Sequence, residues 1–218
     1  MCLKGVRIMK VIGICGSPRM NGNSAAMLDA ALNGAREPGA EVQRINLFDL
    51  QYSGCKSCFA CKKLGGESFG RCALRDELTP VLEKVLSADA VIIASPLYFG
   101  ETPGAVRNFL ERLWFPGQKY AKNYASAYPK RVKVGLIYTM NLPDERMYGD
   151  VIKRHQQNCM LLLGKTEVVT AVDTMQFDDY SLYASEMFDG AAKKQRRETV
   201  FPQDCAKAYE MGKRLASK

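Results

Sequence analysis

Four of the eight cysteines fall within one short stretch, in the spacing C-x2-C-x2-C-x10-C. They are Cys55, Cys58, Cys61 and Cys72. Three thiols at successive i, i+3 steps can face one small volume, and a fourth can close it from the far side of a loop. Such a set is typical of an iron–sulfur cluster, a zinc ion or redox-active thiols.

The spacing favours a cluster over a single ion. Zinc sites usually combine two C-x2-C pairs on separate segments, whereas thiols at two successive x2 spacings suit a polynuclear cluster. Positive charge around the motif is expected to lower the thiol pKa values and to offset the negative charge of a ligated cluster. The basic residues concerned are Lys56, Lys62, Lys63, Arg71 and Arg75. We therefore predict a [4Fe–4S] cluster, with redox-active thiols and then zinc as the alternatives.

A second candidate site follows the apolar run Val11–Cys15, where the chain reads Gly16-Ser17-Pro18-Arg19-Met20-Asn21-Gly22-Asn23-Ser24. The segment lacks both G-x-G-x-x-G and the G-K-[ST] of a P-loop. Backbone N–H groups at a helix N-terminus, with Ser17, Arg19, Asn23 and Ser24, would bind a phosphate monoester. The simpler alternative is a turn with one N-cap residue. Because four such side chains stand together, we favour the phosphate site.

A third segment, Ser95–Gly104, combines prolines, two aromatic residues and glycines at the end of another apolar run. In open α/β sheets, ligands bind outside the carboxyl ends of the strands at the switch point. Such a loop can place backbone amides and apolar groups against a planar heterocycle, although Tyr98 and Phe99 could also be ordinary core or surface aromatics. A phosphate site beside a site for a flat ring predicts FMN.

The elements that must position these residues alternate along the chain. Short apolar runs predict strands at 11–15, 41–46, 88–95, 132–138 and 166–172. Helical periodicity predicts helices at 23–36, 76–87, 104–114, 145–163 and 204–216. Alternating strands and helices are typical of parallel βαβ units, so we predict one domain over 1–218, with three layers around a doubly wound five-stranded sheet of order 2-1-3-4-5.

Two segments do not fit the alternation. The cysteine-rich loop spans 51–75, and a polar stretch at 173–202 carries the run Lys193–Arg197. We predict the second to be a surface excursion, a dimer arm or a flap. Its basic run is also a candidate docking surface for an acidic redox protein.

Composition excludes several function classes. The net charge of +8 favours anionic ligands or partners, but aromatic residues are not interleaved with the basic ones, so we expect no nucleic-acid partner. No apolar run approaches a membrane span, and 1–10 has no signal-peptide core. We therefore expect a cytoplasmic protein without a disulfide framework.

Four stretches together carry a resemblance to a known family: GSPRMNGNS, the C-x2-C-x2-C loop, ADAVIIASPLYFGETPGAVRNFLER and FPQDCAKAYEMGKRL. The chain resembles the iron–sulfur flavoproteins, within the NAD(P)H-dependent FMN reductase branch of flavodoxin-like proteins. One departure is the gap before Cys72, which is longer than in the family's compact motif.

The resemblance implies an FMN-binding oxidoreductase that exchanges electrons between FMN and a cluster. It implies ferredoxin or NAD(P)H as donor, a small-molecule acceptor, and a homodimer or homotetramer. The FMN phosphate would be bound by Ser17, Arg19, Asn23 and Ser24. The ring would be bound by Pro96, Leu97, Tyr98, Phe99 and Gly100, with Thr139, Met140 and Asn141 closing its other side. Two alternatives stay open: a cluster-free NAD(P)H-dependent FMN or quinone reductase, and a non-catalytic electron carrier.

The remaining candidates for chemistry are few. Cys15, Cys159 and Cys205 are expected to be small buried hydrophobes. His155 follows Lys153 and Arg154 in what we predict to be an exposed part of its helix, so we assign it no catalytic role. No acid–base side chain stands out, as expected where the flavin supplies the chemistry.

Overall fold

Five parallel strands and six α-helices alternate along the chain in the structure, a computed structural model that describes residues 7–121 and 125–217. The strands are β1 (Lys10–Cys15), β2 (Glu41–Asn46), β3 (Ala90–Pro96), β4 (Lys133–Thr139) and β5 (Thr166–Ala171). The helices are α1 (Asn23–Arg36), α2 (Leu78–Ser87), α3 (Gly104–Gly117), α4 (Gly149–Leu162), α5 (Gly190–Thr199) and α6 (Phe201–Ala216).

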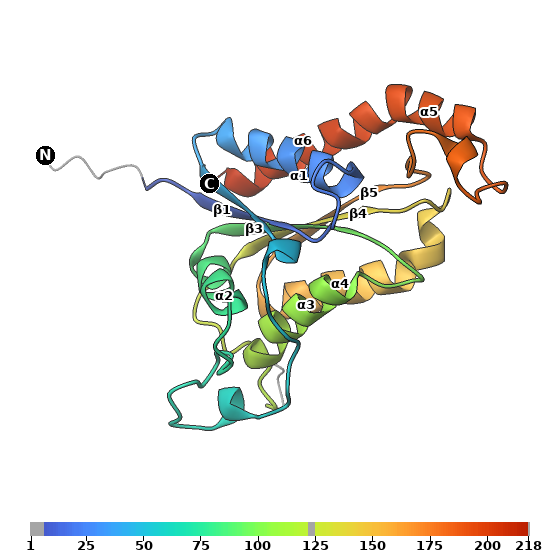
Figure 1. The fold of residues 1–218 in the computed structure, drawn as a ribbon. Helices are drawn as coiled ribbons and strands as arrows, with labels where there is room; N and C mark the ends of the chain where they lie inside the picture. The colour runs from blue at the N-terminus through green and yellow to red at the C-terminus, as the bar shows by residue number, and fades with distance from the viewer. Residues whose placement is uncertain (1–6, 122–124, 218) are drawn as a thin grey trace, which may run out of the picture.

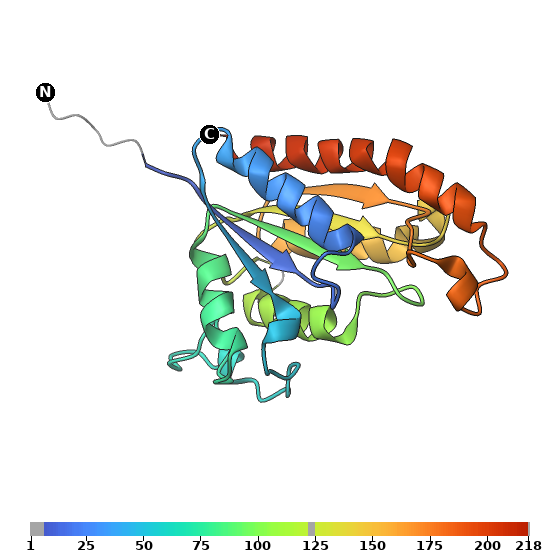
Figure 2. The same ribbon diagram turned by 45° about the horizontal axis from the view of Figure 1, so that its top comes forward.

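The sheet order is β2-β1-β3-β4-β5, which confirms the predicted doubly wound topology. Helices α1, α5 and α6 lie on one side of the sheet and α2, α3 and α4 on the other (Figure 1). The same three layers are visible in Figure 2, where all strands point toward one edge of the molecule. The loops that follow β1, β3 and β4 therefore meet at that edge.

Each face of the sheet has its own apolar core, because side chains alternate along a strand. In β3, Val91 and Ile93 pack into the core with α2, α3 and α4. Ala90, Ile92 and Ala94 pack into the core with α1 and α6. This double burial explains why the strand reads as a continuous apolar run.

Helices α1 and α6 approach each other at two glycines. A Cβ on Gly34 would lie 1.9 Å from the carbonyl oxygen of Tyr209, and one on Gly212 would lie 1.8 Å from that of Ala31. Any larger side chain would force the helices apart, so these glycines fix the position of α1.

The structure corrects three local predictions. The stretch at 173–202 is not only a surface excursion, because it contains α5 and contacts the loops at the strand ends. The predicted helix from Glu145 begins with the short 3-10 turn Glu145–Tyr148 before α4. His155 is fully buried rather than exposed.

Among the described helices, none combines the length and the apolar character that a membrane span needs.

Candidate functional site

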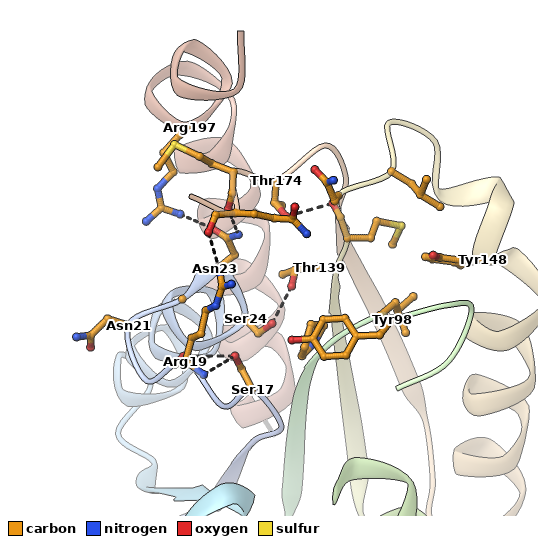
Figure 3. Close-up of a pocket in the computed structure, with 18 of the residues that line it drawn as sticks. Ser17, Arg19, Asn21, Asn23, Ser24, Tyr98, Thr139, Tyr148, Thr174 and Arg197 are labelled. Carbon is orange, nitrogen blue, oxygen red and sulfur yellow. Dashed lines mark hydrogen bonds between the residues drawn. The ribbon is translucent and has the colours of Figure 1, made fainter. Parts of the chain in front are cut away.

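A cleft of about 670 Å³ lies where β1, β3 and β4 end (Figure 3). This volume is within the roughly 300–1,000 Å³ typical of small-molecule sites. All the residues predicted to bind FMN line it, apart from Gly100. They are Ser17, Arg19, Asn23, Ser24, Pro96, Leu97, Tyr98, Phe99, Thr139, Met140 and Asn141.

One end of the cleft is formed by the N-terminus of α1. The N-cap residue is Gly22, which has no side chain to bond the first backbone N–H groups, and the first turn of α1 carries no acidic residue. Ser17 Oγ accepts from the backbone N–H of Arg19 at 3.1 Å and shapes the preceding turn. The end of the cleft thus offers N–H donors and an arginine to an anion.

Helix α1 is joined to the end of β4 inside the cleft. The hydroxyl groups of Ser24 and Thr139 share a buried hydrogen bond of 2.7 Å (Figure 3). On the other side, the backbone N–H of Leu97 donates to the carbonyl of Thr139 at 3.0 Å. Loops after three different strands are therefore held together by direct hydrogen bonds.

The predicted ring loop ends in a tight two-residue turn. Tyr98 and Glu101 exchange two backbone hydrogen bonds of 2.8 and 3.0 Å, with Phe99 and Gly100 between them. Both inner residues have positive φ, +51° for Phe99 and +83° for Gly100. Gly100 therefore shapes the turn, whereas the Phe99 side chain is fully exposed on the rim of the cleft.

The opposite wall of the cleft comes from the stretch after β5, which was not predicted to contribute to this site. Arg19 Nη1 donates to the carbonyl of Gln176 at 2.6 Å, and Asn23 Nδ2 donates to that of Met175 at 2.8 Å. Thr174 Oγ1 donates to the carbonyl of Met140 at 3.1 Å. The cleft residues that were not predicted are Asn21, Gly22, Leu142, Tyr148, Thr174, Met175, Gln176, Asp178 and Arg197.

Helix α5 fixes the loop after β4. The Lys193 side chain is buried, and its Nζ donates to Asn141 Oδ1 at 2.6 Å and also pairs with Asp173. Three of the four cations in the run Lys193–Arg197 are thus held within the chain, because Arg196 pairs with Asp204 and Arg197 bonds Asn23. Lys194 is therefore the exposed cation of this run, and docking of an acidic redox protein on the run stays a prediction.

A buried polar group lies behind the ring loop. His155 Nδ1 is 2.9 Å from the Tyr138 hydroxyl, and Nε2 is 3.2 Å from a carboxylate oxygen of Glu101. Burial lowers the pKa of His155 to about 4, and the Glu101 carboxylate opposes this shift only in part. The ring is therefore neutral near pH 7, and within the described residues its buried Nε2 makes no hydrogen bond despite its approach to Glu101.

The four cysteines of the 51–75 loop line one small cavity. The cavity is shared with Arg112, Phe115 and Pro116 of α3. Within the described residues, no group of three or more His, Cys, Asp or Glu side chains is arranged to hold a metal ion. A cluster is wider than a single ion and separates its thiolates further, so the four cysteines suit a cluster by the chemistry of the donor set.

At Cys61 the shift in thiol pKa is opposite to the one predicted for the cysteines of this cavity. Burial raises the pKa of Cys61, and the nearby Lys62 ammonium offsets only part of that increase. Burial also lowers the pKa of Lys62 itself, which donates to the carbonyls of Phe115 and Gln118 at the end of α3. The expected depression of thiol pKa is therefore wrong for Cys61.

Arg112 holds the fourth cysteine in this cavity. Its buried guanidinium donates from Nε to Cys72 Sγ at 3.3 Å and from Nη1 to Asp76 at 2.5 Å and to the carbonyl of Ser53 at 3.2 Å. These bonds join both ends of the cysteine loop to α3. Despite the ten residues between Cys61 and Cys72, Cys72 therefore lines the same cavity as the other three cysteines.

The two candidate sites lie at different ends of α3. The ring loop leads into Gly104, the first residue of the helix, whereas the cysteine cavity contacts Arg112 to Pro116. At a rise of 1.5 Å per residue, these positions are separated by about 12 to 18 Å along the helix axis.

Known proteins share both the sequence and the fold. The model of the family described as NADPH-dependent FMN reductase matches residues 9–135. An iron–sulfur flavoprotein of Methanocaldococcus jannaschii is 38% identical over 104 residues, covering 48% of this chain and 51% of that protein. The iron–sulfur flavoprotein of Methanosarcina thermophila is 34% identical over 104 residues, covering 48% and 52%. The chain spans about half the length of the curated relatives it matches.

Solved structures support the fold. The NAD(P)H:quinone oxidoreductase from Methanothermobacter marburgensis superposes with a TM-score of 0.67 at 15% identity, covering 96% of this chain and all of that chain. An FMN-dependent NADH-azoreductase from Bacillus anthracis, solved in complex with FMN, gives a TM-score of 0.64 at 16% identity, covering 97% and 100%. At these identities the likeness concerns the fold alone.

Proposed function

The chain belongs to the NADPH-dependent FMN reductase family, and from this premise we propose that it is an FMN-dependent oxidoreductase of the iron–sulfur flavoprotein type. The observation that carries the proposal is the cleft at the strand ends, in which the predicted phosphate and ring residues come together. A bound FMN would supply the hydride and single-electron chemistry.

The phosphate of FMN fits the end of the cleft at α1. Ser17, Arg19, Asn23 and Ser24 supply hydroxyl, guanidinium and amide donors there, beside a helix N-terminus whose dipole favours negative charge. The isoalloxazine ring fits between Pro96–Phe99 and the loop Thr139–Asn141. Helix α5 supports the second of these loops through Lys193.

Cys55, Cys58, Cys61 and Cys72 would hold a [4Fe–4S] cluster. Their shared cavity and the contact between Arg112 and Cys72 support this assignment. The cluster would provide one-electron transfer beside the two-electron chemistry of the flavin. The donor would be ferredoxin or NAD(P)H, with a small-molecule acceptor, in a cytoplasmic homodimer or homotetramer.

A cluster-free NAD(P)H-dependent FMN or quinone reductase is the second candidate. It is favoured by the burial of Cys61, because burial raises the pKa of this thiol and so opposes formation of the thiolate that a cluster binds. In that case the cysteines would act as thiols, and the chemistry would depend on FMN alone.

Analysis of flavin, iron and acid-labile sulfide in anaerobically purified protein tests both candidates. We expect one FMN and one four-iron cluster per chain, with the cluster lost and FMN retained in Cys72→Ser. Cys205→Ser is the matched control, because it removes a thiol of α6 outside the cysteine loop. Full FMN without iron would establish the cluster-free reductase instead, and protein that binds no FMN would refute the whole proposal.

A further inference from the structure

Helix α5 turns its basic residues toward two different neighbours. Asp189 caps the helix, since its Oδ1 accepts from the backbone N–H groups of Ala191 at 2.9 Å and Ala192 at 3.0 Å. In the helix that follows, Lys193 and Arg197 are four residues apart and share one face. That face meets the cleft, because Lys193 bonds Asn141 and Arg197 bonds Asn23.

Arg197 reaches the end of the cleft that is formed by α1. Its Nη1 donates to Asn23 Oδ1 at 2.7 Å, and Figure 3 shows this bond with the guanidinium beside the labelled Asn23. The guanidinium carbon lies 4.1 Å from the ring centroid of Phe201. This cation–π contact helps to fix the position of the guanidinium, and the bond to Asn23 uses one of its five N–H donors.

The neighbouring Arg196 has a different role. Its guanidinium pairs with the nearly buried Asp204 at 2.8 Å, which joins α5 to α6. Arg197 instead bonds a neutral amide, and none of the salt bridges between described residues includes it. A partly buried guanidinium whose partner is neutral keeps its charge available for an anionic ligand.

The charges at this end of the cleft suit a phosphate. Among the described residues that line the cleft, Arg19 and Arg197 are the cations, and the exposed Asp178 is the carboxylate. Arg19 comes from the loop before α1 and Arg197 from α5, so the two cations approach from different segments. A phosphate monoester carries nearly two negative charges near pH 7, which matches two arginines and a helix N-terminus.

We propose that Arg197 is a phosphate-binding residue, and that α5 thereby makes the cleft specific for FMN over riboflavin. The inference rests on the proposed FMN site and adds to it a residue from the stretch after β5. Riboflavin has the same ring but no phosphate, so the contribution of Arg197 is confined to FMN. Arg19 and Arg197 would hold the phosphate from two sides, with Asn23 between them.

The test compares FMN and riboflavin binding to flavin-free protein by isothermal titration calorimetry and quenching of flavin fluorescence. Arg197→Gln removes the charge at the cleft, and Lys194→Gln removes the same charge from an exposed position on the same helix. We expect Arg197→Gln to weaken FMN binding about 10- to 100-fold, the range for hydrogen bonds to charged groups, and to leave riboflavin binding within about twofold. Lys194→Gln should bind both flavins like the unmodified chain.

A third variant separates the contribution of the planar guanidinium group to FMN binding from the contribution of its positive charge. Arg197→Lys keeps the charge without the planar fork, so its FMN affinity should lie between those of the unmodified chain and Arg197→Gln. Equal losses for FMN and riboflavin in Arg197→Gln would show a general structural role and overturn the proposal. FMN binding as tight as in Lys194→Gln would also overturn it while leaving the FMN site intact. Failure of the unmodified chain to bind FMN would overturn both this inference and the proposed function.

Discussion

Replacing Phe99 by asparagine should stabilise the flavin-free protein. Phe99 adopts a left-handed backbone conformation with φ of +51° in the turn between Tyr98 and Glu101. This conformation costs an ordinary L-residue roughly 1–2 kcal/mol, whereas asparagine adopts it more readily. The aromatic ring offers no compensation in the flavin-free fold, because the side chain is 105% exposed and buries no apolar surface.

The expected size of the stabilisation follows from the backbone cost at Phe99 and from the absence of side-chain packing to lose. Phe99→Asn loses no packing, and the two backbone hydrogen bonds of the turn do not involve the side chain. We therefore expect the free energy of unfolding to rise by about 0.5 to 1 kcal/mol, a part of the left-handed cost. For a chain of this size, 1 kcal/mol corresponds to an increase in Tm of about 2 to 4 °C.

Urea unfolding of the flavin-free protein measures this change, with Phe99→Ala as the matched control. Alanine removes the same ring but lacks the short polar side chain with which asparagine can bond the local backbone, so it keeps most of the backbone cost. Its free energy of unfolding should stay close to that of the unmodified chain. If Phe99→Asn proved no more stable than Phe99→Ala at equal m-values, the assignment of strain to this turn would be refuted.

The same pair of variants tests what the strained residue does. Backbone strain that costs stability is often kept where it serves a site. Phe99 lies on the rim of the cleft and both variants remove its exposed ring, so they should lose affinity for FMN or for the acceptor to the same extent, whatever their stabilities. Affinity measured by fluorescence quenching would then separate the role of the ring from the role of the backbone.

Three further outcomes are expected. Gly212→Ala should lower the free energy of unfolding by about 2 kcal/mol or more in urea, because its Cβ would lie 1.8 Å from the carbonyl oxygen of Ala31. The free energy of unfolding should fall as the pH drops from 6.5 toward 4, because burial lowers the pKa of His155 to about 4 and the unfolded chain therefore takes up this proton at a higher pH than the folded chain. Urea titrations at several pH values measure this decrease, and His155→Gln should remove the part of it that is due to His155. Arg112→Met should lower the free energy of unfolding in urea by about 3 kcal/mol, because it leaves the Asp76 carboxylate without its partner.

The strands and the two cleft loops could be predicted from the sequence because their signals are local. Apolar runs buried on both faces mark β1 and β3, and the loops after them must meet at the carboxyl edge of a parallel sheet. The approach of Ser24 to Thr139 follows from that topology. These residues needed no long-range information beyond the order of the strands.

Helix α5 and the burial of His155 were missed for physical reasons that can be identified. Helix α5 is polar on most of its surface, so it gives little apolar periodicity, although Asp189 followed by helix-forming residues is an N-cap signal. His155 follows two cations, but it shares the buried face of α4 with Val151, Cys159 and Leu162. Helical spacing would have indicated that face more reliably than the adjacent charges.

The position of α3 bears on how the two proposed cofactors would exchange electrons. Within one chain, the ring loop and the cysteine cavity are separated by about 12 to 18 Å along this helix. The cavity lies near Phe59, an exposed aromatic residue of the cysteine loop, and the cleft carries Phe99 on its rim. Exposed aromatic side chains beside both sites are suited to contact another chain. In the oligomer that the family resemblance implies, a cysteine loop that met the cleft of another copy would shorten this path, so a variant that is monomeric should keep its FMN and lose fast transfer between flavin and cluster.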